Sequence, residues 1–238
     1  MELLTVVAPV FSTNCYLIVA DDRTCVVVDA GAGVASEVRR LVAARDLTPV
    51  AVLATHGHVD HTWDAAELTA AFEVPFVLHA SDVYRLADPF GTLGQLGASH
   101  DAGGPLAQAL ADVGADPGRY RAPDRVEGFG GPPDAHGRSA DTVLQLGGVR
   151  LVARHAPGHT EGSTLYLLDA EPAVALTGDV LFAGTIGRTD LPGGDSAVMS
   201  ATLRDVVHTL DPQTVLRPGH GPSSRLDVEL GRNPYLCG

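Results

Sequence analysis

The sequence predicts an α/β (α+β) fold in which helices flank β-sheets. Short apolar runs recur along most of the chain, and several of them end at a polar residue. Segments with helical periodicity alternate with these runs, except at the start of the chain, where the runs cluster. The runs predict strands at Leu3–Val7, Cys15–Val19, Cys25–Asp29, Val50–Ala54, Phe76–His79, Val149–His155, Thr164–Leu168, Ala173–Thr177 and Thr214–Leu216.

Apolar residues spaced to share one helical face predict helices at Ala35–Arg45, Asp64–Phe72 and Ala197–Leu210. From Asp88 to Ala140 this periodicity gives way to Gly, Pro, Asp and Ala, and only Leu106–Val113 keeps a helical pattern. A loop of this length inside a compact domain is usually functional or disordered. We therefore expect a single domain over residues 1–238, with a partly mobile Gly/Pro-rich insertion or flap at about 88–140.

The composition narrows the classes of partner. The formal net charge is −13, so a polyanion such as nucleic acid would be repelled at long range. No apolar run approaches the roughly 20 residues that a membrane-spanning helix needs, which argues against a membrane partner. The start, Met1-Glu2-Leu3-Leu4, lacks the features of a secretory signal, and we expect a cytoplasmic location.

Two residue types exclude particular chemistries. All sixteen basic residues are Arg, so a Schiff-base lysine and a phosphate-loop lysine are excluded, and arginine must bind any anionic substrate. The three cysteines, Cys15, Cys25 and Cys237, are odd in number and widely spaced. They fit neither a disulfide framework nor a cysteine zinc site, and we expect buried or incidental thiols.

A segment rich in histidine follows the predicted strand Val50–Ala54 and reads Thr55-His56-Gly57-His58-Val59-Asp60-His61. Side chains two residues apart share a face of an extended segment, so His56 and His58 could chelate one ion. Asp60 and His61 lie where the chain turns into a helix, and they could reach a second ion nearby. Four candidate ligands cannot surround two ions, so further ligands must come from elsewhere.

Three other strand ends offer such ligands, because each follows an apolar strand and a glycine. They are His159 in Ala156-Pro157-Gly158-His159-Thr160, Asp179 in Thr177-Gly178-Asp179 and His220 in Pro218-Gly219-His220-Gly221. Imidazole nitrogen and carboxylate oxygen suit borderline divalent cations; zinc is expected first, while iron and manganese also accept these ligands.

This ordered set resembles the metallo-β-lactamase superfamily over almost the whole chain from Asn14 onward. The resemblance implies a four-layered αββα sandwich with two divalent metal ions at one edge, between the sheets. It also implies the ligands: His56, His58 and His159 for the first ion, Asp60, His61 and His220 for the second, and Asp179 as a bridge.

Within the superfamily, the segment Gly178–Asp190 and the tail Arg232–Leu236 are similar to the short glyoxalase II-like hydrolases. This implies hydrolysis of a 2-hydroxyacyl thioester, such as S-lactoylglutathione, by a metal-bridging hydroxide that Asp60 and Asp179 orient as the catalytic carboxylates. A thioester also suits the site because its leaving thiolate, with a conjugate acid of pKa about 8.5, departs without much help. The chain departs from the longer enzymes, since only eighteen residues follow His220 and lysine is absent, so the thiol carrier stays open.

Arg188 is the candidate for binding a substrate carboxylate, because a guanidinium matches that group with two hydrogen bonds. The competing interpretation is that Arg188 pairs with Asp190 and braces the loop. Arg225 and Arg232 are weaker candidates of the same kind. The remaining histidines are expected to be exposed or hydrogen-bonded, namely His79, His100, His136, His155 and His208.

Other functions remain open at this level. A persulfide dioxygenase with a single iron shares the ligand motifs and a Gly-Arg-Thr-Asp segment like Gly187–Asp190. A lactonase or a β-lactamase uses the same fold family, and a nuclease is disfavoured by the negative charge. A metal-binding scaffold without catalysis is the hypothesis from another class, and the complete ligand set argues against it.

Overall fold

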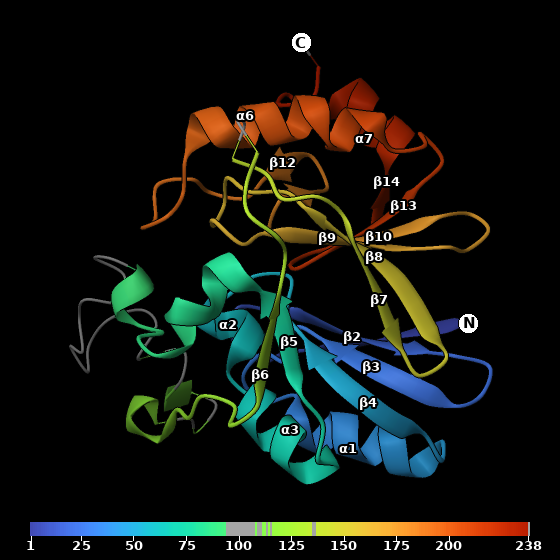
Figure 1. Cartoon of the computed structure of the whole chain (residues 1–238), viewed down its shortest axis with the longest axis vertical. Helices are drawn as coiled ribbons and strands as arrows, with labels where there is room; N and C mark the ends of the chain where they lie inside the picture. The colour runs from blue at the N-terminus through green and yellow to red at the C-terminus, as the bar shows by residue number, and fades with distance from the viewer. Residues whose placement is uncertain (94–107, 109–110, 113, 115, 135–136, 238) are drawn as a thin grey trace.

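The protein consists of two six-stranded sheets that pack face to face, with helices on the outer face of each (Figure 1). This computed structural model describes residues 1–93, 108, 111–112, 114, 116–134 and 137–237. The arrangement confirms the four-layered αββα sandwich that the family resemblance implies. None of the helices in those ranges is long and apolar enough to cross a membrane.

The first sheet contains the N-terminal strands in chain order, from β1 to β6. Strands β1 to β3 are antiparallel neighbours, whereas β3, β4, β5 and β6 run parallel to one another. The bounds are Glu2–Val7 for β1, Asn14–Val19 for β2, Thr24–Val28 for β3, Thr48–Leu53 for β4, Phe76–His79 for β5 and Val126–Phe129 for β6.

The second sheet has the order β14-β13-β10-β9-β8-β7, and only its β10–β13 pair is parallel. A small hairpin, β11–β12, follows β10. The bounds are Thr142–Leu146 for β7, Val149–His155 for β8, Thr164–Leu168 for β9, Val174–Gly178 for β10, Leu181–Phe182 for β11, Thr185–Ile186 for β12, Val215–Pro218 for β13 and Ser224–Arg225 for β14.

Helices α1 (Ala35–Ala44) and α3 (Ala65–Phe72) cover the first sheet, and α6 (Ser196–Asp205) and α7 (Leu226–Arg232) cover the second. The single helix expected over Ala197–Leu210 is wrong at its end, because α6 stops at Asp205. Val206 still lies in the right-handed helical region, with φ −119° and ψ −58°, and the chain continues from it as a short 3₁₀ turn that begins at the buried Val207. The shorter helices are α2 (Val59–Thr62) and the 3₁₀ turns η1 (Ala80–Leu86), η2 (Gly91–Leu93), η3 (Pro117–Arg119) and η4 (Val207–Thr209).

Strand β2 shows why the central strands are continuous apolar runs. Its residues alternate between two cores: Leu17 packs toward α1 and α3, and Ile18 packs between the sheets. Both side chains are fully buried. Burial of such a side chain is worth about 1.5–3 kcal/mol, so a strand covered on both faces is strongly held. These strands give the ligand-bearing loops a rigid base.

Strand β6 lies within the segment that the sequence left without regular structure. It is an edge strand whose middle residues, Glu127 and Gly128, are exposed, so no apolar run marks it. The expected helix Leu106–Val113 lies mostly outside the described residues, as do His100 and His136. The single domain and the flap at about 88–140 stay predictions.

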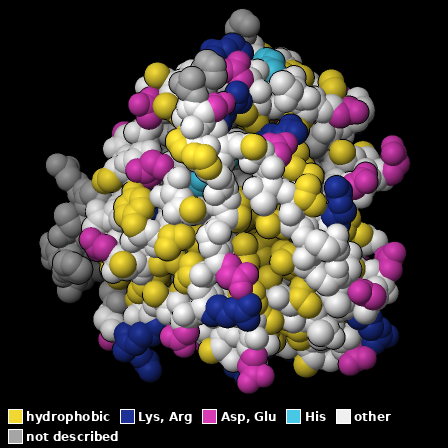
Figure 2. All heavy atoms as spheres, viewed as in Figure 1, with side chains coloured by type: hydrophobic (Ala, Val, Ile, Leu, Met, Phe, Trp, Pro, Cys, Tyr) yellow, Lys and Arg dark blue, Asp and Glu magenta, His cyan; other side chains and the backbone are white. Residues whose placement is uncertain are grey.

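Acidic and basic side chains are scattered over the surface in view in Figure 2, and some of them lie side by side. Exposed pairs such as Arg40–Glu37 and Arg225–Asp227 are typical. Exposed pairs of this kind contribute about 0–1 kcal/mol each, so the fold depends on the apolar cores rather than on them.

Candidate metal centre

Four loops bring the predicted ligands together at one edge of the sandwich. The histidine-rich segment follows β4, His159 follows β8, Asp179 follows β10 and His220 follows β13. Because β10 and β13 are parallel neighbours, the residues just beyond their carboxyl ends emerge side by side. All seven predicted ligand residues meet in this place.

Three histidines form one group with their ring nitrogens turned inward. His159 Nε2 lies 2.9 Å from His58 Nδ1 and 3.2 Å from His56 Nε2. The distance between His56 Nε2 and His58 Nδ1 is 3.1 Å. All three side chains are at most 3% exposed, so this group is almost closed to solvent.

A second group combines Asp60, His61 and His220. His220 Nε2 lies 3.2 Å from His61 Nε2 and 3.2 Å from Asp60 Oδ2. This side is more open, because the side chains of His220 and Asp60 are 25% and 18% exposed. Asp179 lies between the groups: Oδ1 is 3.4 Å from His61 Nε2, and Oδ2 is 3.7 Å from His159 Nε2.

The donor set fits divalent cations. Ring nitrogens that converge at about 3 Å cannot all hydrogen-bond one another, whereas a cation at their centre accepts all of their lone pairs. Asp179 Oδ1 is buried and has no hydrogen-bond partner among the described residues, as expected of an oxygen that awaits a cation. The cluster therefore could hold metal in its three-histidine group, in its second group, or in both, with Asp179 between them.

Three of the histidines have a hydrogen-bond partner on Nδ1, the ring nitrogen that points away from the cluster. These contacts fix the orientation of the rings. His159 Nδ1 donates to the carbonyl of Arg188 at 2.7 Å, and His220 Nδ1 donates to the carbonyl of Phe11 at 2.9 Å. Such bonds place a proton on Nδ1 and leave Nε2 as the nitrogen that a metal would bind. His56 Nδ1 lies 3.2 Å from Thr55 Oγ1, which has the same effect on its ring.

Asp29 belongs to the site although sequence reasoning gave it no role there. It is fully buried at the end of β3, and its carboxylate accepts hydrogen bonds from Thr55 N at 2.7 Å and Thr55 Oγ1 at 2.9 Å. Its Oδ2 also lies 3.1 Å from His61 Nδ1. The sequence pattern that predicted the metal ligands also applies to Asp29, because it is a polar residue directly after an apolar strand.

The pKa shifts give a mixed picture of protonation in the metal-free protein. Burial lowers the pKa of His56 and His58 well below the usual range, with neighbouring histidines adding to it, so both rings are neutral near pH 7. Burial alone would raise the pKa of Asp60, but His61 and a hydrogen bond from His220 bring it to about 2. The pKa of Asp179 is likewise well below its usual range, because His61 and His220 outweigh its burial. Both carboxylates are therefore anionic. For His61 and His220 the adjacent aspartates outweigh burial and raise the pKa, in His220 to about 9, so a metal would displace a proton from each.

The arginine candidates lie outside this cluster of inward-facing groups. The Arg188 guanidinium makes two hydrogen bonds to Asp190, at 2.7 and 2.8 Å, and both side chains are about half exposed or more. The Arg188 backbone, by contrast, reaches the site through its carbonyl on His159. Arg225 pairs with Asp227, and Arg232 is exposed on α7.

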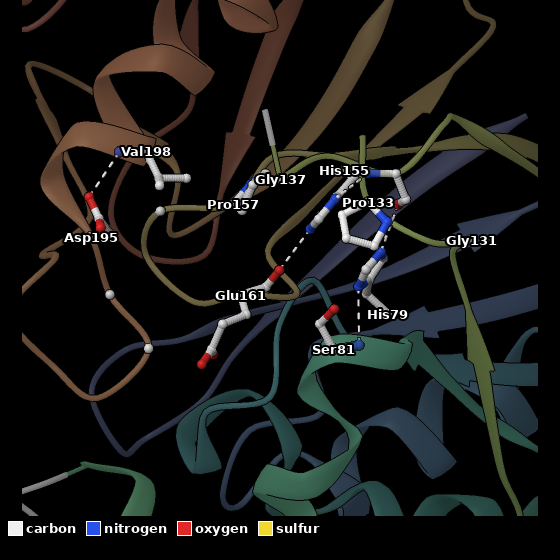
Figure 3. A pocket seen from close by; sticks show the side chains of 14 residues that line it. His79, Ser81, Gly131, Pro133, Gly137, His155, Pro157, Glu161, Asp195 and Val198 are labelled. Carbon is white, nitrogen blue, oxygen red and sulfur yellow. Dashed lines mark hydrogen bonds between the residues drawn. The ribbon is translucent and has the colours of Figure 1, made fainter. Parts of the chain in front are cut away.

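Two further histidines line a separate cavity of about 410 Å³ (Figure 3). The rings of His79 and His155 stack with centroids 4.0 Å apart. Every ring nitrogen has a protein partner: Ser81 N and Ser139 Oγ on His79, and Ser139 N and the Glu161 carbonyl on His155. The prediction that these histidines are hydrogen-bonded is confirmed, and His208 is exposed as expected.

Comparison with known proteins agrees with this geometry. The family model of the metallo-beta-lactamase superfamily matches residues 8–220. The probable metallo-hydrolase YqgX of Bacillus subtilis is 32% identical, with 94% of this chain and 92% of that protein covered. Hydroxyacylglutathione hydrolase GloC of Haemophilus influenzae is 29% identical, with 99% and 97% covered.

Two solved structures share the fold over their whole length. The BLEG-1 B3 metallo-beta-lactamase superposes with a TM-score of 0.78 at 28% identity, covering 100% of both chains. TTHA1623, solved in a di-iron-bound form, gives a TM-score of 0.71 at 28% identity, covering 99% of this chain and 100% of its own.

Proposed function

The chain belongs to the metallo-beta-lactamase superfamily, and on this premise we propose that it hydrolyses a 2-hydroxyacyl thioester, such as S-lactoylglutathione, to the acid and the free thiol. The observation that carries the proposal is the convergence of five histidines and two aspartates into two adjacent groups. In the proposed assignment each group would hold one divalent ion, zinc being the first candidate and iron or manganese the others, and Asp179 would be a ligand shared by the two groups.

Two adjacent divalent ions would lower the pKa of a shared water and polarise the carbonyl of the thioester. The protein's own groups complete this chemistry. Asp60 and Asp179 are anionic and face the space between the histidines, so they could accept a hydrogen bond from the attacking water and fix its direction. We assign these two carboxylates the catalytic role of orienting the nucleophile. The thiolate leaves without a dedicated acid because its conjugate acid has a pKa of about 8.5.

The likeness to GloC, a hydroxyacylglutathione hydrolase, supports the 2-hydroxyacyl thioester as substrate. The segment Gly178–Asp190, on which the sequence resemblance depends, forms the β11–β12 hairpin and the loop whose Arg188 carbonyl accepts from His159. We propose that the Arg188 side chain binds a carboxylate of the substrate. To do so, its guanidinium would release Asp190 and bind the substrate instead. Without lysine, arginine is the cationic side chain left to bind a carboxylate of the thiol carrier.

The alternative is a persulfide dioxygenase that uses one iron. The segment Gly187-Arg188-Thr189-Asp190 favours it, because the sequence of that branch is similar there. Two histidines and a carboxylate with open positions suit oxygen chemistry at ferrous iron. A lactonase or β-lactamase activity is the remaining outcome to be measured, and the structural likeness to BLEG-1 makes a β-lactam a necessary member of any panel.

The test is a panel of thioesters, lactones, β-lactams and glutathione persulfide, assayed on protein whose metal content has been measured. The proposal predicts hydrolysis of S-lactoylglutathione or a related 2-hydroxyacyl thioester, with release of one free thiol per acid formed and no oxygen uptake. Protein that holds one iron per chain, consumes oxygen with the persulfide and leaves thioesters intact would overturn it in favour of the alternative.

A further inference from the structure

A buried carboxylate outside the ligand set joins the two loops that carry the three-histidine group. Asp82 lies in η1, just after β5, and is 0% exposed. We infer that Asp82 is a positioning residue that sets the geometry and affinity of the three-histidine site, while the site formed by Asp60, His61 and His220 does not depend on it. This inference rests on the metal binding that the proposed function assumes.

One oxygen of Asp82 connects loops that lie about a hundred residues apart in sequence. Its Oδ2 accepts a hydrogen bond from Gly57 N at 2.7 Å and from Thr160 Oγ1 at 2.7 Å. Gly57 is the residue between His56 and His58, and Thr160 directly follows His159. A single atom therefore bonds to a residue next to each of the three ligands.

The other oxygen and its neighbours hold the carboxylate in place. Oδ1 accepts from Gly162 N at 2.8 Å and from Arg85 Nε at 3.1 Å. Arg85 is also 0% exposed, and its guanidinium donates in addition to Glu161 and to the Pro192 carbonyl. The buried negative charge thus has a buried counter-charge, and four donors saturate its two oxygens.

Glycines lie at the two positions where the ligand loops come closest to Asp82 and Arg85. A Cβ at Gly57 would lie 2.9 Å from the Asp82 carbonyl and 2.8 Å from Arg85 Cδ, and one at Gly162 would lie 2.6 Å from Asp82 Cγ. Only glycine lets the two loops close on the carboxylate. The glycine of the His-Gly-His segment is therefore explained by Asp82 as well as by access to the metal.

The second group is oriented by different residues. His61 lies against Asp29, and His220 donates to the Phe11 carbonyl. None of the hydrogen bonds of the Asp82 carboxylate reaches a neighbour of these two ligands in the described part of the chain. Loss of Asp82 should therefore weaken one metal site and spare the other, which general destabilisation would not do.

The experiment is Asp82→Asn, studied by titrating the purified metal-free protein with Zn²⁺ against a chromophoric chelator, and with Co²⁺ by its visible absorption. An amide must turn its NH₂ toward one pair of donors, so two hydrogen bonds are lost. We expect one of two metal-binding steps to weaken by roughly 10–100-fold, the size typical of groups that orient metal ligands. The Co²⁺ spectrum of that step should change, while the other step keeps its affinity.

Asp64→Asn is the matched control. Asp64 is also a buried carboxylate that accepts a backbone N–H, from Ala35 at 2.8 Å, but that amide begins α1 rather than a ligand loop. It should leave both affinities unchanged. If Asp82→Asn does not fold, Thr160→Val removes one hydrogen bond from Asp82 with little change in shape, and should weaken the same step by a smaller factor.

The inference would be overturned if Asp82→Asn or Thr160→Val left the affinity of both metal-binding steps unchanged. It would also be overturned if both steps lost affinity equally. The outcome is independent of the substrate. If the wild type binds metal in two steps but hydrolyses no thioester, the proposed function fails while the role of Asp82 can still be measured.

Discussion

The protein contains two clusters of buried histidines that differ in where their ring nitrogens point. In the metal centre, the nitrogens of His56, His58 and His159 point at one another from 2.9 to 3.2 Å. In the second cluster, His79 and His155 stack face to face, and each of their nitrogens points at a serine or backbone partner. Burial is similar in the two places, so burial alone does not identify a metal site.

What distinguishes the clusters is whether the lone pairs are already used. A buried imidazole whose nitrogens are both hydrogen-bonded is stable as a neutral group and has nothing left for a metal. Nitrogens that face each other leave lone pairs that one cation can satisfy together, and the anionic Asp60 and Asp179 add the charge that favours it. The direction of the nitrogens, rather than the number of histidines, therefore identifies the reactive end of this sandwich.

The largest expected effect is on turnover when a carboxylate of the metal centre is neutralised. Asp60→Asn keeps the shape of the side chain but removes the charge next to His61 and His220. We expect a loss on the order of 10²-fold or more in kcat for the thioester, the size seen when a group that stabilises the transition state is removed. Circular dichroism should show an unchanged fold, and unchanged hydrolysis would refute the assigned role of Asp60.

A smaller effect is expected on the free energy of unfolding when zinc is added. Variants in the two histidine clusters should differ in how much stability zinc adds. A ligand that binds only the folded state stabilises it by about 2.7 kcal/mol at 100 times its Kd. Zinc at that concentration should raise the free energy of unfolding of the wild type by this order, and His56→Ala should lose much of the gain. His155→Gln is the matched variant, since it removes a buried histidine whose nitrogens bind Ser139 N and the Glu161 carbonyl.

The His155→Gln protein should be less stable by about 1–3 kcal/mol, because a buried partner is left unsatisfied. Its gain on adding zinc should nevertheless equal that of the wild type. Equal gains in His56→Ala and the wild type, measured by urea unfolding, would mean that the converging nitrogens bind no metal and would remove the distinction between the clusters.

The sequence could predict the features that a local pattern determines, but not those that depend on contacts between distant segments. Strand segments covered on both faces, such as Cys15–Val19 in β2 and Ala51–Leu53 in β4, are largely apolar, and they are visible as runs. The ligand loops are visible because glycine and a metal-binding residue follow such strands. Asp82 gives no comparable signal, because its role exists only where three segments distant in sequence meet. Edge strand β6 was missed since one side of it faces solvent.

The last expected effect concerns the pH dependence of stability in the second cluster. Burial and the neighbouring His155 lower the pKa of His79 from 6.5 to about 4. Because the folded state disfavours the protonated ring, the stability that neutral His79 provides is complete above pH 6.5 and is lost as the pH falls toward 4. In EDTA, the free energy of unfolding of the wild type should fall over this window, and His79→Phe should fall less steeply. Equal slopes in the two proteins would show that His79 is protonated as readily when folded as when unfolded, and that its buried hydrogen bonds do not keep it neutral.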